Sequence, residues 1–65
     1  MNFNKLKKIR LERGLTLQEL AYKTNLSAGY LCHLEKGTRK NPSIDVMEKI
    51  SKALDKTISE IFFSW

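Results

Sequence analysis

The sequence predicts an all-α fold, a compact bundle of five short helices in one domain that spans residues 1–65. Three observations support this class. Apolar residues recur at helical spacing, no segment shows the alternation expected of a strand, and capping residues precede four of the expected helices. A chain of this length buries only ~60% of the surface that its unfolded form exposes, which suits a single small domain.

The first helix is expected over residues 3–13, and Gly14 then provides a stop. Its apolar face is formed by Phe3, Leu6, Ile9 and Arg10, with charged residues around the rest. The second helix is expected from Leu17 to about Thr24. Its predicted buried residues are Leu17, Leu20 and Ala21.

Thr16 and Glu19 have the spacing of a capping box, in which each side chain satisfies a free backbone N–H at the start of the second helix. Asn25 follows that helix, at a position where a left-handed residue would end it. Ser27 can then cap a third helix over residues 28–36. The third helix would turn Leu31 and Leu34 inward, and Gly37 would close it.

Ser43, directly after Pro42, is expected to start a fourth helix. Its apolar positions are Ile44, Met47, Ile50 and Leu54. A second capping box, Thr57 with Glu60, opens a short fifth helix. The fifth helix carries Ile58, Ile61 and Phe62.

The positive charge of the chain is concentrated in its first two-thirds. The net charge is +5, yet residues 1–40 carry nine cations against three anions, and residues 41–65 carry three cations against four anions. This asymmetry indicates a half that faces a polyanion and a half with another role. A solvated basic surface without a partner is the alternative.

The composition argues against catalysis, cofactors and membrane insertion. A single cysteine excludes an intramolecular disulfide, and adjacent helix positions diverge by about 100°, so Cys32 and His33 are poorly placed to share a metal. The chain shows no paired acid and base, metal cluster or glycine-rich phosphate loop. It also lacks a signal peptide and an apolar run long enough to cross a bilayer. We therefore expect a cytoplasmic binding protein with no catalytic residues, no metal, no cofactor and no small-molecule ligand.

Only Asn25, Leu26 and Ser27 separate the second and third helices, and Ala21 is small where these helices would cross. This geometry suits a helix-turn-helix, whose second helix enters the DNA major groove. The stretch GLTLQELAYKTNLSAGYLCHLEKGTRKNPS resembles the helix-turn-helix of the Cro/CI-type (XRE family) regulators of bacteria and phages, especially the SinR-like branch of repressors. The resemblance runs from Leu6 to Ile61. It implies a lambda-repressor-like domain that binds double-stranded DNA and regulates transcription.

The resemblance also implies an ion pair between Arg10 and Glu35 that ties the first helix to the recognition helix. In such helices the N-terminal residues approach base edges, and small side chains let the backbone come close to the duplex. The candidate base contacts are Ala28, Gly29, Tyr30 and His33. The candidate phosphate contacts are Gln18, Lys23, Ser27, Lys36, Thr38, Arg39, Lys40 and Asn41. Two alternatives stay open: Tyr30 packs at the helix edge, and Ser27 is only a cap.

The chain departs from the family pattern at two positions and in its base-reading residues. Leu17 stands where a glutamine is usual, with Gln18 one place later, and Asn25 stands where glycine is most frequent. The third helix also lacks the glutamine or arginine pair that reads bases in phage repressors. Base readout is therefore expected to be sparse, relying on Tyr30, His33 and DNA shape.

The tail ISEIFFSW is rich in large apolar residues, more than one face of a single-turn helix can bury. We therefore expect a homodimer through Ile58, Ile61, Phe62, Phe63 and Trp65, which would place two recognition helices on a pseudo-palindromic operator. The alternative is that Phe63 and Trp65 fold back onto the domain or fray. A second functional hypothesis is a protein-interaction module of the same fold, an antitoxin-like or antagonist subunit that binds a protein.

Overall fold

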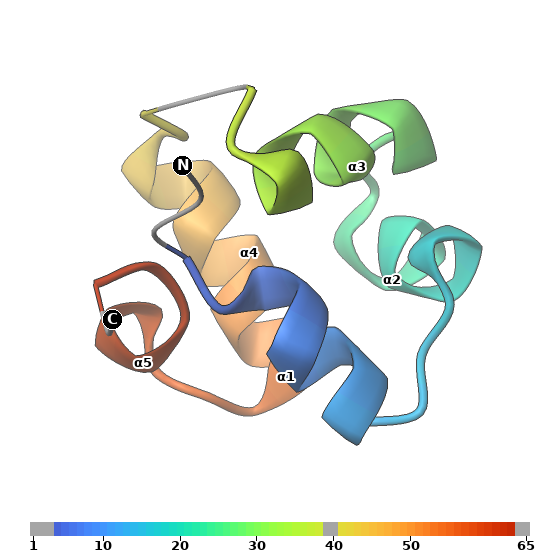
Figure 1. Cartoon of the computed structure of the whole chain (residues 1–65), viewed down its shortest axis with the longest axis horizontal. Coiled ribbons are helices and arrows are strands. Elements are labelled where there is room, and N and C mark those ends of the chain that lie inside the picture. The colour runs from blue at the N-terminus through green and yellow to red at the C-terminus, as the bar shows by residue number, and fades with distance from the viewer. Residues whose placement is uncertain (1–3, 39–40, 64–65) are drawn as a thin grey trace.

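The computed structural model describes residues 4–38 and 41–63, and within these ranges it contains five α-helices and no β-strand (Figure 1). The helices are α1 (Leu6–Glu12), α2 (Leu17–Thr24), α3 (Ala28–Lys36), α4 (Ile44–Leu54) and α5 (Ile58–Phe62). The predicted all-α class is therefore confirmed.

The start of the first helix was predicted wrongly, because α1 begins at Leu6 and not at residue 3. The Asn4 carboxamide oxygen accepts the N–H of Leu6 at 3.1 Å, and its nitrogen donates to the carbonyl of Leu34 at 2.9 Å. The N–H of Lys5 donates to the carbonyl of Ile61 at 2.7 Å. The two bonds to Leu34 of α3 and Ile61 of α5 hold Asn4 and Lys5 in a non-helical conformation before α1. Phe3 lies outside the described residues.

The helix caps predicted from sequence are present. Thr16 and Thr57 each form a complete capping box, and the hydroxyls of Ser27 and Ser43 accept backbone N–H groups at the starts of α3 and α4. Asn25 ends α2 in the left-handed conformation, with φ 59°. Each cap satisfies backbone groups that a helix end would otherwise leave unpaired.

The core is formed by apolar residues from all five helices. Its buried members are Leu6, Ile9, Leu20, Leu31, Leu34, Met47, Ile50, Leu54, Ile61 and Phe62. Leu17 and Ala21, which were expected to be buried, are half-buried and pack against this core. Ile44 stands at the first position of α4 and is 64% exposed, so it does not belong to the core.

Different helices form the two ends of the domain. Helices α2 and α3 pack against each other at one end, α4 packs against α2, and α5 packs against α1 and α4. Figure 1 shows α2 and α3 on one side of the domain and α5 on the other. The predicted recognition helix and the apolar tail therefore occupy opposite ends of the molecule.

Candidate nucleic-acid interface

The connection between α2 and α3 is a tight turn whose path is set by the backbone. Asn25 adopts the left-handed conformation, and the N–H of Leu26 donates to the carbonyl of Ala21 at 3.2 Å. The side chain of Leu26 is half-buried against the core. Since asparagine tolerates this conformation better than most residues, the turn forms without the glycine that is frequent there.

Helix α3 presents one exposed stripe, formed by Gly29, His33 and Lys36. These residues are spaced i, i+4 and i+7, so they follow one face of the helix. The opposite face buries Leu31 and Leu34 in the core. We call the three exposed residues the α3 stripe; it unites two predicted base contacts with one predicted phosphate contact.

Gly29 is not required by packing inside the domain. A Cβ atom built at this position meets nothing within 4 Å. Glycine weakens a helix relative to alanine, so its use here lowers helix stability without an internal steric reason. The bare backbone at the start of the α3 stripe therefore leaves space for an external group.

The remaining predicted residues of the first turn of α3 differ in exposure. Ser27 is exposed, and its hydroxyl accepts the N–H of Tyr30 at 3.0 Å, so its capping role is present. Ala28 is half-buried. Tyr30 is half-buried against the core, which agrees with the packing alternative for this residue. Any contact of Tyr30 with bases would use the part of its ring that remains exposed.

The single carboxylate of α3, Glu35, is turned into the protein. Its Oε2 accepts a hydrogen bond from Nε of Arg10 at 2.5 Å, and its Oε1 accepts one from Nη2 at 3.2 Å. Both side chains are buried. Because this negative charge is neutralised in the interior, the exposed face of α3 carries only His33 and Lys36 as charged or titratable groups.

Polar and basic groups from neighbouring elements flank α3. Gln18 and Lys23 are exposed on α2, while Thr38 and Asn41 are exposed in the loop after α3. At the start of α2, Leu17 packs against the core, whereas Gln18 is exposed. The glutamine available for a contact there is therefore Gln18. Arg39 and Lys40, also predicted to contact phosphates, lie outside the described residues.

Two carboxylates have a lowered pKa. The backbone N–H of Thr16, and next its hydroxyl, bond to Glu19 and hold the pKa of Glu19 below its ordinary value of 4.5. Thr57 lowers the pKa of Glu60 in the same way. Both capping carboxylates therefore stay ionised to a lower pH than an ordinary glutamate, near the positive N-terminal ends of α2 and α5.

The apolar tail is divided between the core and the surface. Ile61 and Phe62 are buried in the core of the domain because α5 turns both side chains toward α1 and α4, so the folded domain does not expose them for the dimer contact expected from sequence. Ile58 is half-buried. Phe63 is 57% exposed and remains available for a partner. Trp65 lies outside the described residues.

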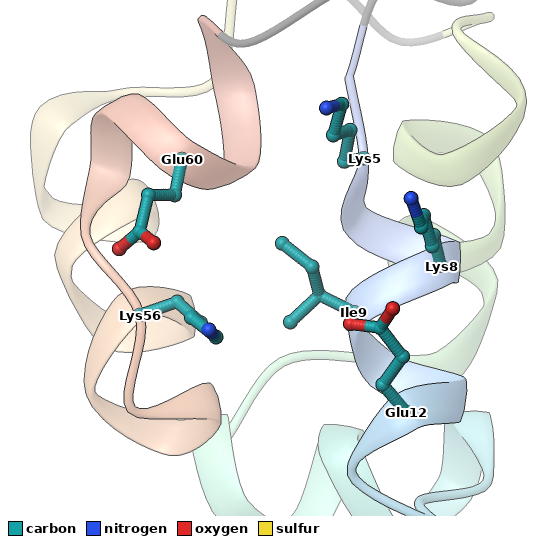
Figure 2. A pocket seen from close by; sticks show the side chains of 6 residues that line it. All are labelled: Lys5, Lys8, Ile9, Glu12, Lys56 and Glu60. Atoms are coloured by element: carbon teal, nitrogen blue, oxygen red, sulfur yellow. The ribbon is translucent and has the colours of Figure 1, made fainter.

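A shallow cleft of about 200 Å³ separates α1 from the segment that leads into α5. Figure 2 shows Ile9 and Lys56 pointing into this cleft from opposite sides. The cleft is lined by Lys5, Lys8, Ile9, Glu12, Lys56 and Glu60. Three lysines and two glutamates line it, so it does not form a uniformly basic surface.

The described residues contain no group of three or more histidine, cysteine or acidic side chains placed to hold a metal ion. Cys32 is a half-buried free thiol. None of the helices in residues 4–38 and 41–63 has the length and apolar character needed to span a membrane.

Sequence reasoning missed one interaction in this region, a contact between Nδ1 of His33 and the hydroxyl of Thr38 at 2.9 Å. The two residues were predicted separately, as a base contact and a phosphate contact. The signal was present in Gly37, because a left-handed glycine after a helix brings the following residue back toward the last turn.

Comparison with known proteins identifies the relatives of this chain. A family model described as helix-turn-helix matches residues 6–61. The HTH-type transcriptional regulator SinR of Bacillus subtilis is 39% identical over 54 residues, which cover 83% of this chain and 49% of SinR. The immunity repressor protein of Bacillus phage phi105 is 44% identical over 57 residues, 88% of this chain and 39% of the repressor. The chain thus spans about half the length, or less, of these curated relatives.

A solved structure agrees with this relationship. The crystal structure of SinR, the master regulator for biofilm formation, in complex with DNA has a TM-score of 0.81 to this chain at 38% identity. The match covers 89% of this chain and 92% of the SinR chain. At this identity the likeness extends beyond the general arrangement of helices.

Proposed function

Because this chain belongs to the helix-turn-helix family, we propose that it binds double-stranded DNA sequence-specifically and regulates transcription. Its action is that of a repressor, which occupies an operator and excludes the polymerase. Its relatives carry names that fit this role, a transcriptional regulator and an immunity repressor. Such a protein would act in the cytoplasm, where the bacterial chromosome lies.

The α3 stripe is the observation that carries this proposal. Gly29 offers bare backbone near the N-terminus of α3, and His33 and Lys36 continue along the same exposed face. The N-terminal residues of a recognition helix are those that reach base edges in the major groove. The burial of Glu35 against Arg10 removes from α3 the one charge that a duplex would repel.

Phosphate contacts would supply the sequence-independent part of the affinity. Lys23 on α2 and Lys36 at the end of α3 are exposed, and Gln18, Ser27 and Asn41 add neutral groups. With ~6 phosphate contacts in a dimer, affinity would fall by about three decades between 50 and 200 mM salt.

We further propose that the protein acts as a homodimer whose contact includes Phe63. This ring is 57% exposed and directly follows α5, the helix that lies on the side of the domain away from α2 and α3 (Figure 1). A twofold pair would present two recognition helices about one DNA turn apart. Sedimentation of the Phe63→Ser variant tests this: we expect a monomer, whereas Ile44→Ser, at another exposed apolar residue, should behave as wild type. Equal association of all three proteins would argue against the contact.

Selection of bound duplexes from a random pool, followed by affinity measurements across a salt series, tests the function. We expect recovery of a pseudo-palindromic sequence and a steep loss of affinity with salt. Undetectable duplex binding at low salt would contradict the proposal and favour the protein-interaction module.

A further inference from the structure

We propose that Thr38 positions the imidazole of His33 so that its Nε2 accepts a hydrogen bond from an amino group on a major-groove base edge. This inference rests on the DNA-binding function proposed above. It assigns His33 one kind of base contact, with an amino group that donates a hydrogen bond. It also gives Thr38 a positioning role in place of the phosphate contact predicted from sequence.

The C-terminus of α3 brings the two residues together. Gly37 adopts the left-handed conformation with φ 78°, its N–H donates to the carbonyl of Leu34 at 3.2 Å, and the N–H of Thr38 donates to the carbonyl of His33 at 3.0 Å. These two bonds form a Schellman motif, in which the second residue past the helix lies against the last turn. In many proteins an apolar contact occupies this place. Here the Thr38 hydroxyl lies 2.9 Å from Nδ1 of His33.

The hydroxyl of Thr38 makes a second contact that decides which group donates. Its oxygen lies 3.2 Å from the carbonyl oxygen of His33, in a geometry in which the hydroxyl donates. A hydroxyl has one proton, so if that proton bonds the carbonyl, the oxygen accepts from Nδ1–H. Only the tautomer with the proton on Nδ1 satisfies both contacts. In the neutral ring Nε2 is then an acceptor.

The orientation leaves Nε2 available to a ligand. His33 is exposed, and no hydrogen bond joins Nε2 to any residue in the described part of the chain. One turn before it lies Gly29, over which the space is open. A group that approaches the α3 stripe therefore meets a fixed acceptor beside a stretch of bare backbone.

The chemistry of base edges indicates what this acceptor reads. In the major groove, cytosine and adenine present amino groups, whereas guanine O6 and N7 and thymine O4 only accept. A neutral His33 held in the Nδ1–H tautomer would thus prefer cytosine or adenine at one position. It would disfavour a guanine or thymine in the same place, because two acceptors would face each other.

The tautomer is tested first, on the free full chain, so that the result does not depend on DNA binding. Nitrogen NMR of the imidazole at a mildly alkaline pH distinguishes a protonated Nδ1 from a protonated Nε2. We expect Nδ1–H to predominate in wild type and in Thr38→Ser, and the usual excess of Nε2–H to return in Thr38→Val. Predominant Nε2–H in wild type, or no change in Thr38→Val, would overturn the positioning role.

The readout is tested with the selected duplex and its single-base-pair variants. We expect His33→Ala to lose roughly tenfold or more of the discrimination at one base pair, occupied by cytosine or adenine, with little change elsewhere. Thr38→Val should lose part of the same discrimination, and Thr38→Ser should retain it. Thermal unfolding of each variant establishes that it is folded. Unchanged discrimination in His33→Ala would overturn the inference while leaving the proposed function intact; failure of wild type to bind any duplex would overturn both.

Discussion

Arg10 on α1 and Glu35 on α3 form a buried ion pair through two hydrogen bonds, of 2.5 and 3.2 Å. The same guanidinium donates through Nη1 to the carbonyl of Leu15 at 2.7 Å. One side chain thus joins α1, the turn before α2 and the C-terminal part of α3. The orientation of the α3 stripe relative to the rest of the domain depends on this junction.

Loss of one partner of this pair should be severe. In Glu35→Leu or Arg10→Met the remaining charge is buried without its partner, and we expect a loss of ~3–5 kcal/mol in the free energy of unfolding. That loss is comparable to the total expected for a domain of this size. The double variant should recover most of it, because no unpaired charge remains. Urea denaturation of the four proteins gives the comparison, and single-variant losses below about 1 kcal/mol would show that the pair has little structural role.

Two glycines provide a matched test of why Gly29 lacks a side chain. Gly29→Ala should raise the free energy of unfolding by up to about 1 kcal/mol, since a methyl group meets no atom there and alanine favours the helix. It should nevertheless weaken DNA binding by roughly tenfold, about 1.4 kcal/mol. Gly14→Ala should do the reverse: its φ of +71° costs alanine about 1–2 kcal/mol of stability, while the folded protein keeps its DNA affinity. Full DNA affinity in Gly29→Ala would mean that no duplex comes close at this position.

The salt dependence of DNA binding should identify the lysines that contact phosphates. For Lys23→Ala and Lys36→Ala we expect the slope of log affinity against log salt to become shallower by about 0.9 for each phosphate that the variant no longer neutralises. Lys56→Ala is the control, because Lys56 lies in the cleft between α1 and α5 (Figure 2) and should leave the slope unchanged. Equal slopes for Lys36→Ala and Lys56→Ala would exclude Lys36 from the interface.

Acid should destabilise the protein through its two capping carboxylates. The pKa values of Glu19 and Glu60 are lowered in the folded state by bonds from Thr16 and Thr57, so the folded protein favours their ionised forms. Their contribution to stability is present above pH 4.5, the ordinary pKa, and is lost as the pH falls through the lower folded values. In Glu19→Gln and Glu60→Gln, measured by urea denaturation at several pH values, the decline of stability with acid should be shallower. A decline as steep as that of wild type in both variants would contradict this role of the caps.

Local signals in the sequence predicted most of the fold. Thr16, Ser27, Asn25 and Gly37 act through bonds to residues a few positions away, so their patterns alone located the ends of α2 and α3. The start of α1 was missed because Asn4 and Lys5 bond to Leu34 and Ile61, far away in the chain. No local pattern records such a bond.

Fewer features of the candidate site than of the fold could be predicted, because several depend on how helices pack or on which side-chain atoms meet. Gly29 and His33 were predicted as base contacts and Lys36 as a phosphate contact, and all three are exposed on one face of α3. The burial of Ile61 and Phe62 depends on where α5 packs, which the apolar composition of the tail does not reveal. The bond between His33 and Thr38 is local; Gly37 signals that Thr38 returns toward the last turn of α3, but it does not indicate which side-chain atoms meet there.

The most direct test of the central claim, that the exposed face of α3 meets DNA, is an NMR titration of the isotope-labelled chain with its selected duplex. We expect the largest amide shift changes at Gly29, His33 and Lys36, with smaller ones at Lys23 and almost none at Lys56. Changes confined to α5 and the cleft between α1 and α5, with the α3 stripe unaffected, would contradict the account.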